Sequence, residues 1–93
     1  MPLTFTWDSR KAARNERKHR ITFEEASTIF RDEQEVMISD PEHSAKEERF
    51  VSLGVSDQGR LLTVSYTESG EAIRIISARL ATSSEHLEYV NGT

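Results

Sequence analysis

Apolar and polar residues alternate in several short stretches of the chain, which is typical of half-buried β-strands. The first stretch runs from Leu3 to Trp7, near the N-terminus. Beyond residue 35, four more short apolar or alternating runs follow, separated by residues that favour turns. Together these runs predict strands over residues 3–7, 36–38, 49–56, 60–67 and 72–78.

Helical spacing and capping residues predict three helices between and after these strands. Asp8 or Ser9 can cap a first, weakly amphipathic helix that runs to about Arg20. Capping boxes of the T-x-x-E type begin at residues 22 and 82. They predict a second helix over about 22–30 and a last helix that ends near Val90.

The elements follow one another in the order β-α-α-β-β-β-β-α, and residues 1–93 are expected to form a single domain. Short turns favour a meander, so we expect an α+β fold in which an antiparallel sheet carries its helices on one face. If the helices cover the apolar side chains of residues 51–55, 62–66 and 73–75, the other face is open and polar. The side chains expected on this open face are Ser52, Thr63, Ser65, Thr67 and Arg74.

Three arginines in or beside the last two strands are the first candidates for chemistry. Arg74 interrupts a run of isoleucines, where a guanidinium must face water, pair with an acid or bind an anion. Arg79 ends the same strand, and counting by two puts it on the opposite face from Arg74 unless a β-bulge or the strand end intervenes. Arg60 begins the partner strand and could simply flank the turn. A phosphate clamp and ordinary cross-strand ion pairs both fit these positions.

The segment after residue 42 contains groups that can transfer protons. His43 is the first candidate for a general acid or base, because an unperturbed imidazole titrates near neutrality. Glu47 and Glu48 are the next candidates, or they are ion-pair partners of the arginines. Composition alone favours a solvated loop here.

Charge is distributed unevenly along a chain whose net charge is −4. Residues 1–31 contain seven Lys and Arg against four Asp and Glu, whereas residues 32–93 contain five against twelve. Most of the positive charge lies on the first predicted helix, which is either a solvated surface or a basic patch for RNA or phosphate. At the end of this helix, Lys18 either complements the helix dipole or assists catalysis, and His19 is interpreted as a half-buried, hydrogen-bonded ring.

Several common kinds of site have no counterpart in the sequence. There is no cysteine, no HExxH spacing, no Gly-rich phosphate loop and no nucleophile elbow, so we expect no metal and no cofactor. No apolar run approaches the ~18 residues of a membrane helix, and the first ten residues lack the form of a signal peptide. We therefore expect a cytoplasmic protein without a membrane partner.

Short segments between about Phe5 and Ala81 resemble, in their order, the BrnT toxin family. They are Trp7-Asp8, Lys11-Ala12, Asn15, Lys18-His19, Ile21, Phe23-Glu24, Ala26 to Phe30, His43-Ser44, Glu47, Arg49, Gly59 to Leu62, Tyr66-Thr67 and Ile73 to Arg79. The family pattern has a glycine after the Lys-His pair, where this chain has Arg20. The closing helix is also less basic than the family leads us to expect.

The resemblance implies a bacterial type II toxin with a RelE-like fold, acting as a metal-independent endoribonuclease that inhibits translation. It also implies a BrnA-like ribbon-helix-helix antitoxin as partner, RNA as substrate, and contact with operator DNA only through the antitoxin. The catalytic residues expected on this hypothesis are Arg74, Arg79, His43, Glu47, Arg60 and Lys18. The alternative is a non-catalytic module that binds RNA or docks another protein.

Overall fold

The computed structural model describes residues 3–38 and 49–92 and confirms the predicted order of strands and helices. The elements are β1 (Thr4–Thr6), α1 (Ser9–His19), α2 (Phe23–Ser27), the 3-10 helix η1 (Thr28–Arg31), β2 (Val36–Ile38), β3 (Phe50–Val55), β4 (Leu61–Ser69), β5 (Ala72–Leu80) and α3 (Ser83–Asn91). Within these described ranges, no helix is both long and apolar enough to span a membrane.

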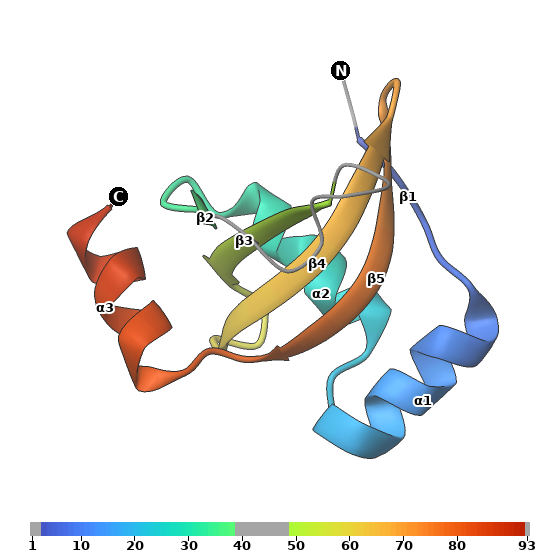
Figure 1. Ribbon diagram of the computed structural model, residues 1–93, viewed down its shortest axis with the longest axis horizontal. Coiled ribbons are helices and arrows are strands. Elements are labelled where there is room, and N and C mark those ends of the chain that lie inside the picture. Colours follow the sequence, from blue (N-terminus) through green and yellow to red (C-terminus); the bar gives the residue numbers. More distant parts are fainter. Residues whose placement is uncertain (1–2, 39–48, 93) are drawn as a thin grey trace.

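The five strands form one sheet in the order β1-β5-β4-β3-β2 (Figure 1). Strands β2 to β5 make the expected antiparallel meander, but β1 pairs in parallel with β5. The prediction of a purely antiparallel sheet is therefore wrong, and the sheet is mixed. Tight turns set the directions of the later strands, whereas β1 and β5 are joined by most of the chain, a long connection that permits parallel pairing.

The second predicted helix, over 22–30, divides into α2 and η1. The hydroxyl of Thr28 donates to the carbonyl of Glu25 at 2.6 Å, and the hydroxyl of Ser27 donates to the carbonyl of Glu24 at 2.7 Å. Such side-chain bonds compete with the regular helical ladder, which explains the tighter 3-10 turn that follows. Thr22 caps α2 by accepting from the amide of Glu25 at 3.0 Å.

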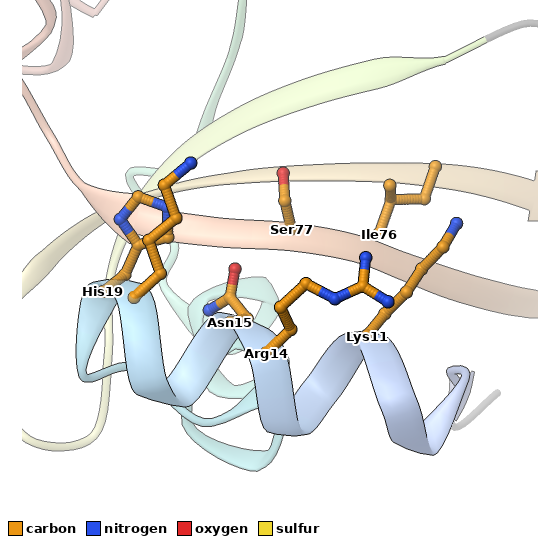
Figure 2. A pocket seen from close by; sticks show the side chains of 7 residues that line it. Lys11, Arg14, Asn15, His19, Ile76 and Ser77 are labelled. Carbon is orange, nitrogen blue, oxygen red and sulfur yellow. The ribbon is translucent and has the colours of Figure 1, made fainter.

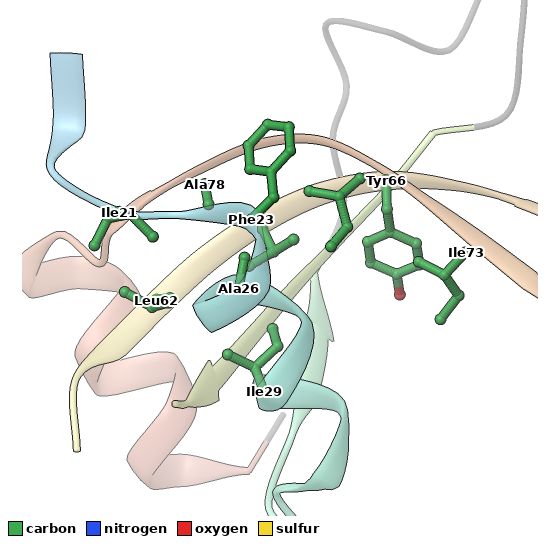
Figure 3. Packing of buried hydrophobic residues seen from close by; sticks show 10 residues of the cluster. Ile21, Phe23, Ala26, Ile29, Leu62, Tyr66, Ile73 and Ala78 are labelled. Atoms are coloured by element: carbon green, nitrogen blue, oxygen red, sulfur yellow. The ribbon is translucent and has the colours of Figure 1, made fainter. Parts of the chain in front are cut away.

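The hydrophobic core lies between the α2 segment and one face of β4 and β5, here called the first face of the sheet (Figure 3). Its fully enclosed side chains come from the helical segment and from alternate positions of the two longest strands. They are Ile21, Phe23, Ala26, Ile29, Leu62, Val64, Tyr66, Ile73, Ile75 and Ala78. The period-2 pattern of β4 thus places its apolar residues as expected.

Strand β3 faces the other way from the sequence prediction. Its register pairs Ser52 with Val64 and Leu53 with Thr63, and paired residues share a face. Ser52 is therefore on the first face, where its hydroxyl lies 2.8 Å from that of Tyr66, and Leu53 is on the second. The turn between β3 and β4 fixes this register, and a register displaced by one residue exchanges the two faces of a strand.

The helices also occupy both faces of the sheet, so the expectation that all of them lie on one face is wrong. Helix α3 contacts β3, and Glu85 of α3 accepts a hydrogen bond from Thr63 at 2.8 Å on the second face. Leu53, which is fully buried, is on this same face. The second face is thus apolar and covered near β3, while its polar half lies over β4 and β5.

Candidate functional site

The polar half of the second face is built from one side of β4 and one side of β5. The pairs Thr63–Arg79, Ser65–Ser77 and Thr67–Arg74 place six polar side chains on it. Ser65, Thr67 and Arg74, three of the five residues predicted for an open face, are confirmed here, whereas Thr63 lies on this face but is buried beneath Glu85 of α3. Ser52, the fifth, lies on the first face instead.

A β-bulge puts Arg74 and Arg79 on the same face. Ser65 pairs with Ser77 but the next residue, Tyr66, pairs with Ile75, so Ile76 is an extra residue in β5. The extra residue reverses the alternation between the two arginines, as the sequence analysis required for them to share a face. They are five positions apart, about 16 Å along an extended strand. The two guanidinium groups therefore cannot both bind one phosphate group unless their side chains move.

Arg74 is exposed and makes no hydrogen bond or ion pair with any residue in the described ranges. Its charge does interact electrostatically with Asp8. The pKa of Asp8 lies below its usual range, mainly because the amides of Lys11 and Arg10 donate to its carboxylate, and the charge of Arg74 adds a smaller effect. The guanidinium of Arg74 is thus available for an anion.

Arg79 is already paired with an acid of the last helix. Its two terminal nitrogens donate to the two carboxylate oxygens of Glu85 at 2.8 and 2.9 Å. This bidentate pair, together with bonds from the Thr82 amide and the Thr63 hydroxyl, holds the pKa of Glu85 at about 2. Another anion can reach Arg79 only in competition with this carboxylate.

Arg60 lies away from the second face. Its guanidinium forms an ion pair with Glu25 of α2 and donates to the carbonyl of Arg20 at 3.3 Å. The pKa of Glu25 is lowered, first by Arg60 and then by the hydroxyl of Ser56, which donates to it at 2.6 Å. The structure therefore does not bring Arg60 together with Arg74 and Arg79.

A groove between α1 and β5 adds a second group of cations, with a cavity volume of about 240 Å³. Figure 2 shows Lys11 and Arg14 extending from α1 beside Ile76 and Ser77 of β5. We call this feature the α1–β5 groove. Its lining residues are Lys11, Arg14, Asn15, Lys18, His19, Ile76 and Ser77.

Asn15 fixes the distance between the two walls of the groove. Its side-chain amide donates to the carbonyls of Ala78 at 2.9 Å and Ile21 at 3.0 Å, and its oxygen accepts from the Ala78 amide at 3.0 Å. Asn15 thereby satisfies the edge of β5 beyond the short strand β1, as a neighbouring strand would. All of its polar atoms are used, so its role is structural.

Of the remaining predicted residues, one lines the groove and the others fall outside the described residues. His43, Glu47 and Glu48 lie outside the described residues, so their positions relative to Arg74 stay predictions. Lys18 lines the groove with His19, a ring that the sequence analysis treated as structural. The sequence analysis did not name Lys11 and Arg14 as site residues, although they recur with Lys18 and His19 at helical spacing on one side of α1, a signal that was present in the sequence.

No group of three His, Asp or Glu side chains suited to a metal ion occurs among residues 3–38 and 49–92. Tyr66, which lies between Ser65 and Thr67 in β4, is buried in the core, and this burial raises its pKa. The described site therefore consists of cations and hydroxyl groups, together with the Glu85 carboxylate that binds Arg79 and Thr63.

Comparison with known proteins agrees with this architecture. The profile of the family described as "Ribonuclease toxin, BrnT, of type II toxin-antitoxin system" matches residues 7–85. A crystal structure of the ribonuclease toxin BrnT from Brucella abortus superposes with a TM-score of 0.67 at 20% sequence identity, covering 88% of this chain and 100% of that chain. No curated protein sequence matches significantly. The chain belongs to the BrnT family of type II toxin–antitoxin ribonuclease toxins.

Proposed function

We propose that this protein is a metal-independent endoribonuclease toxin with a RelE-like fold, which inhibits translation by cutting RNA. The observation that carries the proposal is the open guanidinium of Arg74 on a polar sheet face that continues into a basic groove. Guanidinium groups bind phosphate oxygens in a bidentate manner and stabilise charge that develops on them. Membership of a ribonuclease toxin family supports the same activity.

The reaction that suits this site is attack by a ribose 2′-oxygen on the adjacent phosphorus. A base removes the 2′-hydroxyl proton, the new O2′–P bond forms, and the P–O5′ bond breaks as an acid protonates the leaving 5′-oxygen. Arg74 stabilises the charge on the non-bridging oxygens. His43 is our first candidate for the proton transfers, followed by Glu47, Glu48 and Lys18.

The other two arginines have different places in this proposal. Arg79 joins the substrate by exchanging Glu85 for a phosphate, since both ligands fit its planar fork. Arg60 maintains the fold, because its partner Glu25 is buried and would be costly to leave unpaired.

A type II toxin requires an antitoxin that neutralises it, and the family description includes such a system. We propose a BrnA-like ribbon-helix-helix protein as this partner, with operator DNA contacted only through the antitoxin. The alternative of a non-catalytic binding or docking module predicts no RNA cleavage by the purified chain.

The replacement Arg74→Ala tests the proposal. We expect cleavage to fall by about 10²–10³-fold, the usual effect of removing one group that stabilises transition-state charge. The measurement is the rate of RNA cleavage by purified protein, together with growth arrest and RNA cleavage after induction in cells with and without the neighbouring open reading frame.

A matched control replaces Arg31, an exposed arginine of η1, by alanine, and should retain full activity. A folded Arg74→Ala variant that cleaves as fast as the parent would remove Arg74 from the active site. If the parent protein itself binds RNA without cutting it, the non-catalytic alternative is correct.

A further inference from the structure

We propose that the α1–β5 groove binds the phosphodiester backbone of single-stranded RNA next to the site of cleavage. This inference rests on the proposed ribonuclease function and extends it to a surface on α1 from which the catalytic hypothesis uses only Lys18, as one of several candidates for proton transfer. The residues that carry it are Lys11, Arg14 and Lys18 as phosphate ligands, with Ser77 and His19 as additional hydrogen-bonding groups.

The charge of the groove differs from that of the molecule. Of the seven described residues that line it, three are cations and none is a carboxylate, on a chain whose net charge is −4. Glu16, the acid in the middle of α1, instead lines a hollow on another side of the helix with Arg17 and Arg20. Among the described residues, no acid forms a hydrogen bond or ion pair with the side chains of the three groove cations. Asp8 interacts electrostatically with Lys11, but no acid of the described residues does so with Arg14 or Lys18, whose charges are therefore not offset in the groove.

The spacing of the cations fits a polyanion better than a single small anion. Lys11, Arg14 and Lys18 occupy one side of α1 and span about 10 Å along a helix that rises 1.5 Å per residue. A stacked nucleic-acid strand presents a phosphate about every 3.4 Å along its axis, so about three phosphates can lie against this row. A small metabolite with one phosphate would leave most of the row unused.

The groove is preformed and opens toward the candidate catalytic face. Asn15 holds α1 against β5 through its bonds to Ala78, so no rearrangement is needed to form the groove. The bulge residue Ile76 and its neighbour Ser77 form the β5 wall. Ser77 also belongs to the second face through its pairing with Ser65. A strand lying in the groove therefore continues toward Arg74 on that face.

The test compares two variants that remove equal charge from the same helix. Arg14→Gln/Lys18→Gln removes two groove cations, whereas Arg10→Gln/Arg17→Gln removes two arginines of α1 that do not line the groove. The probe is a short fluorescein-labelled single strand with 2′-O-methyl ribose throughout, which cannot be cut by attack of a 2′-oxygen. Affinity is measured at several salt concentrations.

We expect the groove variant to reduce the slope of log K against log salt by about 1.4, since each phosphate contact on a single strand contributes about 0.7. The control variant should change the slope by less than half as much. The charge-conserving variant Arg14→Lys/Lys18→Arg should keep the slope of the parent. Circular dichroism establishes that each variant is folded, as expected for exposed positions of α1.

The outcomes separate this inference from the proposed function. Equal slopes for groove and control variants overturn the RNA groove, even if the parent cleaves RNA. A parent that cleaves no RNA refutes the ribonuclease proposal, while the slope on the uncleavable strand still decides the groove. A groove variant that binds the strand normally but no longer binds the antitoxin shows that the groove docks protein and overturns the RNA assignment.

Discussion

Arg20 ends α1 in a backbone conformation that usually favours glycine. It ends α1 with φ 60° and ψ 33°, in the left-handed region, and its amide donates to the carbonyl of Glu16 at 2.9 Å. Glycine adopts this conformation without steric cost and is the usual residue at such helix ends. The resemblance to the BrnT family led us to expect glycine here, and the backbone of Arg20 adopts a conformation that suits glycine.

The replacement Arg20→Gly should stabilise the fold by about 0.5–1 kcal/mol, because relief of the left-handed strain exceeds the added freedom of the unfolded chain. Urea unfolding measures the difference. Arg20→Ala keeps the Cβ atom and should bring no comparable gain. Arg17→Gly, in the interior of α1, should destabilise by about 1 kcal/mol. An Arg20→Gly variant less stable than the parent would contradict this account.

At the scale of elements, the attachment of α1 to β5 depends on a buried side chain rather than on a broad apolar stripe. The helix has one buried residue, Asn15, among the described positions of its length. Phe5 and Trp7 before it and Ile21 and Phe23 after it pack against the core and hold its ends. Asn15 holds its middle through three hydrogen bonds. Because few positions of α1 are needed for packing, its exposed positions can carry cations.

Replacement of Asn15 by alanine should lower the free energy of unfolding by about 2–3 kcal/mol, because buried polar groups of Ala78 and Ile21 lose their partner. Urea unfolding measures the loss, and faster hydrogen exchange of the Ala78 amide should accompany it. Ser77→Ala is the control, because the Ser77 hydroxyl lines the same groove without a hydrogen bond to the described residues, and its loss should change stability by less than about 0.5 kcal/mol. Equal effects of the two replacements would contradict the role given to Asn15.

At the scale of the whole molecule, two ion pairs connect helices to opposite faces of the sheet. Glu25–Arg60 joins α2 to the start of β4, and Glu85–Arg79 joins α3 to the end of β5. The carboxyl pKa is lowered in both pairs, to about 2 for Glu85. A lowered pKa means that the folded state favours the ionised carboxylate, so these pairs stabilise the fold above the ordinary carboxyl pKa and lose their effect in acid.

The variant Glu85→Gln isolates one of these pairs. At pH 7 it should be less stable than the parent by about 1–2 kcal/mol, a moderate value because Arg79 is 41% exposed and its charge is screened by water. The difference should shrink as the pH falls from 4.5, the ordinary value, toward about 2. Urea unfolding between pH 7 and pH 2 measures this dependence.

Glu88→Gln is the matched control, since Glu88 lies on the same helix and forms no side-chain ion pair with the described residues. This replacement should leave the free energy of unfolding unchanged between pH 7 and pH 2. A difference between the parent and Glu85→Gln that stays constant down to pH 2 would contradict the assigned pKa.

The candidate site was predictable from sequence only in part. The isoleucines around Arg74 identified it as an unusual position, and the basic side of α1 was visible as a charge pattern. The sequence could not show that Arg60 and Arg79 already have acidic partners, because Glu25 is 35 residues from Arg60 and either arginine could have paired elsewhere. The choice of ion-pair partner depends on tertiary placement.

By itself, the sequence determined the order of the elements, the capped ends of the helices and the apolar side of β4. These features arise from local periodicity and from hydrogen bonds between residues close in the chain. Only the tertiary structure decided the parallel direction of β1, the face presented by β3, the shared face of Arg74 and Arg79, and the groove beside Asn15. Each depends on register, a bulge or a contact between distant segments, which local patterns leave open.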